Sequence, residues 1–193
     1  VWRNWYTNRG NEKTSIWRVN LMFFIEPSRI EIIQVFMEEA KQKHVGLRAG
    51  YKPEYKFAIG LVEVSVAFES FLHIISNKQY VSQRIHDFST EGELTPSINK
   101  IKSAMKQYIL NLKKELDVEQ LQDMTPNSIR PPLIISDIED IKSILSVVYR
   151  VRSNLVHGSK ALSSSRNKIL IENSFHLLYV LMEQICKDKN IIS

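Results

Sequence analysis

The sequence predicts an all-α protein, an antiparallel bundle of about five helices with a short N-terminal aromatic arm or β-hairpin. Three observations predict this class. The 193 residues include only six glycines and six prolines, which favours long uninterrupted elements. Apolar residues recur mainly with the period of a helix, and two Ser-x-x-Glu sequences resemble the capping boxes that open helices. With 44% hydrophobic and 24% charged residues, the chain suits one globular domain with a full core.

Residues 1–26 differ in pattern from the rest of the chain and are predicted to form the arm or hairpin. Four aromatic residues stand close together in this segment, and residues 17–23 mostly alternate between apolar and polar, as in a half-buried strand. We expect the aromatic side chains to pack the arm onto the helical body. The alternative is a stacking platform for unpaired bases beside Arg3 and Arg9. Residues 27–193 are predicted to form the helical domain.

Five helices are predicted in this domain from apolar periodicity, capping residues and breakers. They span about residues 28–43, 53–77, 95–119, 136–157 and 167–187. The first and the fourth open with Ser28-x-x-Glu31 and Ser136-x-x-Glu139, and the second opens with Pro53, whose missing N–H is unpaired at that position anyway. The second helix is apolar nearly all round, which indicates a central position in the bundle.

Composition and charge restrict the classes of function. The net charge of +5 and the isoelectric point near 9.2 favour an anionic partner. The single cysteine, Cys186, excludes intrachain disulfides and multi-cysteine zinc sites and suits a reducing compartment. The five histidines lack metal-ligand spacing, and no apolar run reaches the roughly 18 residues of a membrane span. We therefore expect a cytoplasmic protein with no metal, cofactor or membrane partner, although a chain that begins at Val1 leaves open a preceding domain.

The segment Val151–Lys160, VRSNLVHGSK, carries most of the functional information. It places Arg152, two small polar residues and His157 at the end of the predicted fourth helix, with Gly158 directly after. Steps of four and three from Val148 put Arg152 inside the apolar stripe of that helix. A guanidinium in such a stripe needs a carboxylate partner, a route to solvent or an anionic ligand, because it cannot lose its charge.

Arg152-x4-His157 fits the R-x4–6-H signature of HEPN domains, and the whole string resembles the VRNNLFHG-like stretch common in that superfamily. The resemblance covers the motif, its helix and the next helix, about fifty residues. It implies an all-helical fold, a homodimer with two motifs face to face and, in many members, RNA cleavage without metal. It also implies a toxin or effector role in defence or stress, with an antitoxin or regulatory partner. Ser159 replaces the tyrosine that nucleotidyltransferase antitoxins modify, so control through that position is not expected.

The residue types suit this chemistry. RNA is cleaved without metal when a base deprotonates the 2′-hydroxyl, which then attacks the neighbouring phosphate. Histidine can serve as base or acid near neutral pH, and arginine can bind the phosphate bidentately and offset the charge of the transition state. Asn154 can orient the imidazole or hold a phosphate oxygen. We therefore expect Arg152, His157 and Asn154 to be catalytic, with Ser153 and Glu69 in supporting positions.

Helix geometry keeps a second assignment open. At about 100° per residue, His157 points about 140° away from Arg152, whereas Arg150, Asn154 and His157 share one stripe. Arg150-x6-His157 also satisfies the signature. We favour Arg152 because the polar pair follows it and because a charge in an apolar stripe demands an explanation. This choice requires a distorted helix end or a partner subunit that completes the site.

Structural alternatives stand beside each functional assignment. His157 can simply stabilise the C-terminus of its helix, and Arg152 can pair with Glu63 or Glu69 on the second helix. Glu69 and His73, one turn apart, can form an ordinary surface pair. On this basis the alternative function is a non-catalytic HEPN-like module that binds RNA or pairs subunits.

Two further charged groups are expected to be structural. The acidic residues near the start of the fourth helix resemble a metal-binding set, but the helix dipole favours acids there: Asp137, Glu139 and Asp140. The lysines of the third helix can track phosphates beside Tyr108, but a solvated face is the favoured interpretation: Lys100, Lys102, Lys106, Lys113 and Lys114.

Overall fold

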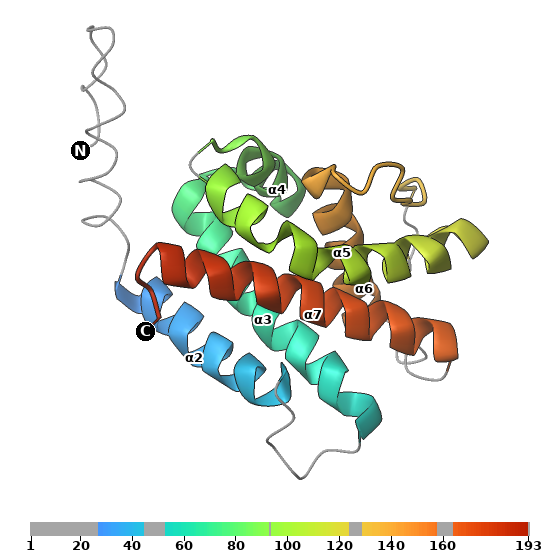
Figure 1. Ribbon diagram of the computed structural model, residues 1–193, viewed down its shortest axis with the longest axis horizontal. Coiled ribbons are helices and arrows are strands. Elements are labelled where there is room, and N and C mark those ends of the chain that lie inside the picture. The colour runs from blue at the N-terminus through green and yellow to red at the C-terminus, as the bar shows by residue number, and fades with distance from the viewer. Residues whose placement is uncertain (1–26, 45–52, 93, 124–128, 158–163, 193) are drawn as a thin grey trace, which may run out of the picture.

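The structure, a computed structural model, describes residues 27–44, 53–92, 94–123, 129–157 and 164–192. Six helices lie in these ranges: α2 (Pro27–His44), α3 (Pro53–Ile75), α4 (Val81–Thr90), α5 (Thr95–Val118), α6 (Ile141–His157) and α7 (Ser165–Asp188) (Figure 1). The described part has no strand, only an isolated antiparallel bridge between Leu121 and Leu133. The predicted all-α class is therefore confirmed. The arm or hairpin predicted for residues 1–26 lies outside the described residues.

Helix α3 is the central helix of the bundle, as its apolar composition predicts. It packs against α2, α4, α6 and α7, and Figure 1 shows it passing behind α7. Gly60 allows α3 and α7 to approach closely, because a Cβ atom added there would lie 2.7 Å from Cε2 of Phe175. A side chain at this position would displace the phenylalanine ring or separate the two helices.

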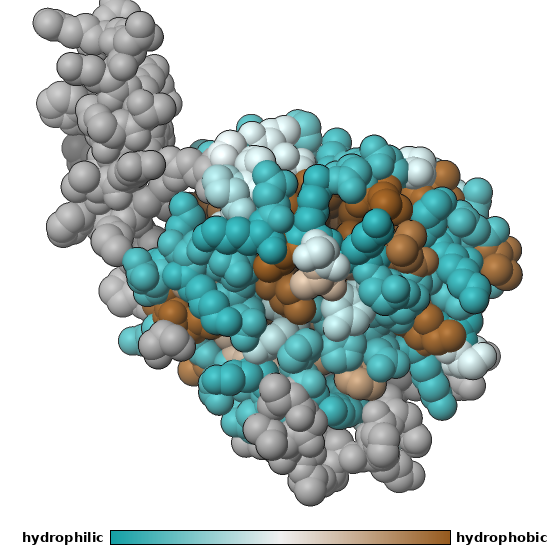
Figure 2. Space-filling view, in the orientation of Figure 1, coloured by the Kyte–Doolittle hydropathy of each residue, from teal (hydrophilic) through white to brown (hydrophobic). Residues whose placement is uncertain are grey.

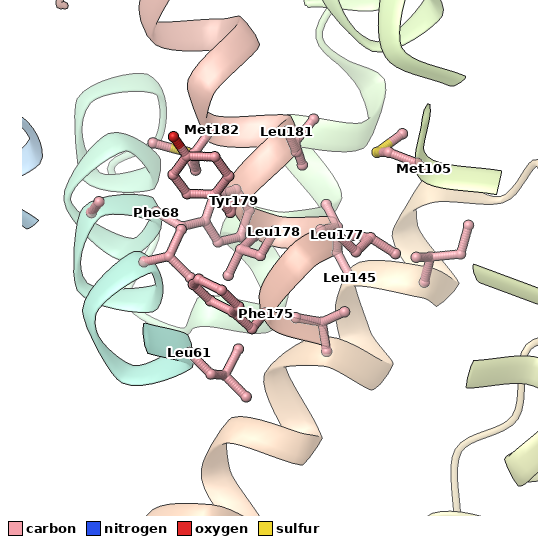
Figure 3. Close-up of a cluster of buried hydrophobic side chains, with 14 of the residues drawn as sticks. Leu61, Phe68, Met105, Leu145, Phe175, Leu177, Leu178, Tyr179, Leu181 and Met182 are labelled. Atoms are coloured by element: carbon pink, nitrogen blue, oxygen red, sulfur yellow. The ribbon is translucent and has the colours of Figure 1, made fainter. Parts of the chain in front are cut away.

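The core collects apolar side chains from every described helix. Figure 3 shows the buried side chains where α3, α5, α6 and α7 meet. They include Leu61, Phe68, Met105, Leu145, Phe175 and Leu177. Each of these side chains is at most 2% exposed. Burying one such side chain fully contributes roughly 1.5–3 kcal/mol, so this core fixes the positions of the helices that carry the polar residues described below.

Residues Tyr55–Ile75 of α3 form a 21-residue stretch that is long and apolar enough to cross a membrane by length and composition. This differs from the expectation that no apolar run has the length of a membrane span. Lys56, Glu63 and Glu69 are the charged residues of the stretch. Within the fold, 56% of its most apolar window is buried against other helices. A helix packed on several sides acquires the same composition as a membrane span.

About five helices were predicted, and the described ranges hold six because α4 was not among those predicted. This helix is only ten residues long, and Tyr80 at its N-cap makes no side-chain hydrogen bond to the helix. Its apolar residues Val81, Ile85 and Phe88 do follow the helical spacing of four and three. Three positions were too few to separate a short helix from a loop.

The two predicted capping boxes were also wrong. Helix α6 begins at Ile141, and the Asp140 carboxylate caps it by accepting from the amides of Lys142 and Ser143 at 3.1 and 3.2 Å. Ser136 therefore lies outside this helix, whereas Ser28 lies inside α2. Aspartate is as good an N-cap as serine, so a Ser-x-x-Glu spacing alone does not locate the first turn.

Candidate functional site

Helix α6 presents polar residues on two different sides. Tyr149 and Arg152, three residues apart, both interact with Glu69 on α3. Arg150 and Asn154, four residues apart, both contact the segment that follows α5. Spacings of three and four place side chains on one face of a helix, whereas a spacing of two places them about 160° apart. The motif arginine and its neighbour therefore belong to different surroundings.

Glu69, Tyr149 and Arg152 form a partly exposed group, here called the Arg152 cluster. Nη2 of Arg152 lies 3.4 Å from Oε1 of Glu69, and the two side chains are 21% and 28% exposed. The guanidinium also lies over the Tyr149 ring, 5.8 Å from its centroid. Burial, followed by the charge of the neighbouring Glu69, raises the pKa of Tyr149. The tyrosine therefore remains a hydrogen-bond donor at neutral pH.

The contacts of the Arg152 cluster are incomplete. Nε of Arg152 and Oε1 of Glu69 are buried atoms without a hydrogen-bond partner among the described residues. The alternative pairing of Arg152 with Glu69 is thus present, whereas Glu63 pairs instead with Lys43 at 2.8 Å. Because Nε is buried, an anion from solvent can approach Arg152 only through the exposed fraction of its side chain, which is 21%.

Near the Arg152 cluster, α4 carries a second arginine, Arg84, which holds α4 to the end of α3. Arg84 is buried and donates to the carbonyls of Lys78 and Gln79 at 2.6 and 3.3 Å and to Nε2 of His73. Burial and the charge of Arg84 lower the pKa of His73. The expected Glu69–His73 surface pair is therefore replaced by a contact of His73 with Arg84, which fixes the connection between α3 and α4.

On the opposite side of α6, Arg150 is a buried anchor. Its side chain is 10% exposed, and its Nη1 lies 3.9 Å from Oδ2 of Asp123, which is 2% exposed and also pairs with Arg130 at 3.6 Å. Burial lowers the pKa of Arg150, and Asp123 opposes this effect. The guanidinium has little access to solvent, so it is poorly placed to receive a phosphate.

Asn154 belongs to the Arg150 side of α6. Its Nδ2 donates to the Gln122 carbonyl at 2.8 Å, and the residue is buried. It lines a pocket of about 110 Å³ between the end of α5, α6 and the start of α7, together with Arg166. Arg166 itself pairs with Glu119 at 3.4 Å. The amide nitrogen of Asn154 is thus already engaged in holding the chain.

His157 is the last residue of α6, as the sequence predicts, and its side chain lies outside the described part of the structure. Ser153 is half-buried next to Arg152. The structure therefore brings Glu69 and Arg152 together and separates both from Arg150 and Asn154. The sequence analysis missed Tyr149, although its spacing of three residues from Arg152 places both on one face of the helix.

A second polar group, the histidine cluster, lies between α2 and α7 and consists of His44, His176, Tyr179 and Glu183. Nδ1 of His176 lies 2.9 Å from Nδ1 of His44, the His44 ring stacks on Tyr179 at 4.3 Å, and Tyr179 donates to Glu183 at 2.9 Å. Burial, then the neighbouring His44 and Lys56, lowers the pKa of His176 to about 4. Burial also lowers the pKa of His44, against the effect of Glu183. The two imidazoles are therefore neutral at pH 7 and serve packing.

The other charged groups of the sequence analysis take structural positions. Asp137 accepts from the Glu139 amide at 2.8 Å, and Asp140 caps α6. In the described ranges, no group of three or more histidine, cysteine, aspartate or glutamate residues is arranged to hold a metal ion. Three of the α5 lysines pair with acids, Lys100 with Asp188, Lys102 with Glu139 and Lys113 with Asp117. The face of the molecule in Figure 2 is largely hydrophilic, as expected for solvated helices.

Comparison of the chain with protein-family models, curated proteins and solved structures finds no match. The resemblance to HEPN domains is therefore limited to the string VRSNLVHGSK. Its consequences for activity, substrate and assembly are proposals.

Proposed function

We propose that this protein is a metal-independent endoribonuclease of the HEPN type, with Arg152 and His157 at its active centre. One observation carries the proposal. The side chain of Arg152 is 21% exposed and stands five residues before His157, the last residue of α6. The all-helical fold also agrees with the class. In this proposal His157 is the general base or acid, and Arg152 binds the scissile phosphate.

The surroundings of the two arginines support Arg152 over Arg150 as the phosphate ligand. A phosphate that enters from solvent requires an accessible guanidinium with free donors. The side chain of Arg152 is 21% exposed, whereas that of Arg150 is 10% exposed and lies against the buried Asp123. The assignment to Arg150, which helix phase alone favours, is therefore the weaker one. Asn154 and Ser153 remain proposed supporting residues.

A homodimer is part of the proposal. On an ideal helix His157 points about 140° away from Arg152, so one subunit does not direct both side chains to the same side of α6. Two motifs facing each other across a two-fold axis supply an arginine and a histidine to one cleft. We further propose a cytoplasmic toxin or effector in defence or stress, under the control of an antitoxin or other regulatory partner.

A non-catalytic HEPN-like module that binds RNA or pairs subunits is the second candidate function. The observation that favours it is the pairing of Arg152 with Glu69, since a carboxylate partner is also what a purely structural arginine requires. This candidate expects dimers or salt-sensitive RNA binding without strand cleavage.

The test is incubation of purified protein with RNA in EDTA, alongside His157→Ala protein, followed by analysis of the product ends. The proposal expects cleavage that survives chelation, disappears in His157→Ala and leaves 2′,3′-cyclic phosphates. It also expects a substrate with 2′-deoxy sugars to resist cleavage, because the attacking hydroxyl is absent. Full cleavage by a folded His157→Ala protein would contradict the mechanism, and absence of cleavage with retained RNA binding would favour the second candidate.

A further inference from the structure

We infer that Glu69 occupies the anion-binding position of Arg152 in the free protein and that a phosphodiester group of RNA displaces it on binding. The inference rests on the proposed function, because it names the residue that sets RNA affinity at the same site. Glu69 is then a residue that tunes substrate binding by competition with the phosphate, and it takes no part in the chemical step.

The geometry of the ion pair is the first support. Oε1 of Glu69 faces Nη2 of Arg152 at 3.4 Å, which is where an oxygen of a bound phosphate would lie. Both Oε1 of Glu69 and Nε of Arg152 are buried atoms that lack a hydrogen-bond partner in the described ranges. The two side chains, 28% and 21% exposed, are therefore held by charge attraction at the edge of the fold, where water and a stronger anionic acceptor can compete for the guanidinium.

Tyr149 makes the displacement inexpensive. It projects from the same face of α6 as Arg152 and lies near enough to Glu69 for the carboxylate charge to raise the pKa of its hydroxyl. When a phosphate takes the guanidinium, Glu69 keeps the neutral Tyr149 hydroxyl beside it and, with 28% of its side chain exposed, gains access to water. A carboxylate left without any partner inside the fold would instead cost several kcal/mol.

The other arginines of α4 and α6 show that this arrangement is particular to Arg152. Arg84 donates to three acceptors on the connection after α3 and on α3 itself. Arg150 faces a carboxylate that is 2% exposed. Neither offers a phosphate both a solvent-accessible approach and a partner that can withdraw toward water.

The experiment measures the affinity for a single-stranded RNA oligonucleotide with 2′-O-methyl sugars, which carries the phosphodiesters but blocks 2′-hydroxyl attack. Fluorescence anisotropy compares wild type, Glu69→Gln, Arg152→Ala and the double variant. Glu38→Gln is the charge-matched control, because Glu38 is exposed on α2 and its carboxylate lies 3.9 Å from Nζ of the likewise exposed Lys41. We expect Glu69→Gln to bind about two- to fivefold more tightly, the range for release of a partly exposed ion pair.

The double variant separates competition from a general charge effect. If Glu69 competes for Arg152, the gain from Glu69→Gln disappears once Arg152 is alanine, so the two substitutions are not additive. A gain of the same size without Arg152, or in Glu38→Gln, would overturn the inference, as would unchanged or weaker binding by Glu69→Gln. Should the glutamine variant fail to fold, Glu69→Asp provides the test, since the shorter carboxylate retracts from Arg152 and is expected to tighten binding by a smaller factor.

Failure of this inference and failure of the proposed function are distinguishable. RNA binding that tightens in Glu69→Gln, with no cleavage of ordinary RNA by any variant, would leave the displacement of Glu69 standing and refute the nuclease. EDTA-resistant cleavage that requires Arg152, with binding unaffected by Glu69→Gln, would refute the displacement and leave the nuclease standing.

Discussion

The two sides of α6 each carry an arginine, and the two arginines differ in solvent exposure and in the burial of their carboxylate partners. On the side facing α3, Arg152 is 21% exposed and lies over the Tyr149 ring. Its carboxylate partner, Glu69, is 3.4 Å away and 28% exposed. On the side facing the segment after α5, Arg150 lies against a carboxylate that is 2% exposed. The two residues stand two positions apart, so the helix turns them about 160° away from each other.

This difference shows what a short sequence signature leaves undecided. Both Arg150-x6-His157 and Arg152-x4-His157 satisfy R-x4–6-H, and the choice between them depends on contacts with residues far away in the chain. Arg150 pairs with the buried Asp123, whereas Arg152 pairs with the partly exposed Glu69 and stays accessible to solvent. The predictions that follow test this division from the largest expected effect to the smallest.

On an ideal helix His157 shares a stripe with Arg150, whereas the proposed chemistry pairs it with Arg152. We expect His157→Ala to lower the rate of RNA cleavage by about 10²–10⁴-fold, the usual contribution of a general acid or base. His157→Asn is the shape-matched control that also lacks a titrating group and is expected to be equally impaired. Initial rates on a labelled RNA measure the effect, and a His157→Ala rate within tenfold of wild type would contradict it.

Arg150→Ala is expected to destabilise the fold by about 3 kcal/mol, because it leaves Asp123 with one ion-pair partner fewer inside the protein. Arg152→Ala is expected to lower the free energy of unfolding by about 1 kcal/mol or less, since its ion pair with Glu69 is partly exposed to solvent. Urea denaturation of both variants measures the free energies of unfolding. Equal losses in the two variants would abolish the distinction between the two sides of α6.

Acid is expected to destabilise the protein through the histidine cluster, independently of α6. Burial lowers the pKa of His44 and His176, that of His176 to about 4. Below pH 6.5 the unfolded chain therefore binds more protons at these two histidines than the folded chain does. This stability is fully present above about pH 6.5 and decreases as the pH falls toward 4, by at most about 1.4 kcal/mol per pH unit for each group. We expect a loss of about 2 kcal/mol in urea titrations at decreasing pH.

His176→Asn is the control for this pH dependence, because its amide can replace the hydrogen bond to His44 without titrating. Its stability is expected to vary less between pH 6.5 and 4 than that of wild type. The variant also separates acid unfolding from titration of His157 in any pH–activity profile. Identical pH dependence of stability in the two proteins would show that His176 does not govern it.

Tyr149→Phe is expected to have the smallest effect, a loss of about 1 kcal/mol or less of stability from removal of the hydroxyl beside Glu69. The ring stays in place beneath Arg152, so cleavage is expected to change by less than the Arg152→Ala variant changes it. Thermal unfolding and initial cleavage rates measure the two effects. A Tyr149→Phe protein as inactive as Arg152→Ala would show that the hydroxyl itself takes part in the reaction.

Much of the fold follows from helical periodicity alone. On α2, Ile33, Met37 and Ala40 follow one another at helical spacings of four and three, and all three are buried. Helix limits were predicted within a few residues except at the start of α6, where Asp140 rather than Ser136 is the cap. Helix α4 was missed because three apolar positions in ten residues give too short a pattern.

The candidate site was predictable only in part. The position of His157 at a helix end and the pairing of Arg152 with Glu69 were both anticipated from spacing and from the need of a partner for a charge in an apolar stripe. The anchoring of Arg150 by Asp123 was not, because the two residues are 27 positions apart and meet only once α6 packs on the preceding segment. Local patterns do not contain contacts between elements.

The most direct test of the account is the rate of RNA cleavage in EDTA by wild type, Arg152→Ala and Arg150→Lys protein, measured side by side. Lysine at position 150 keeps a cation next to Asp123, so the fold is preserved while the guanidinium is removed. The account predicts a loss of about 10²–10³-fold for Arg152→Ala and a rate within a few fold of wild type for Arg150→Lys. Wild-type cleavage by Arg152→Ala, or an equal loss in Arg150→Lys, would contradict the assignment of the accessible arginine to the phosphate.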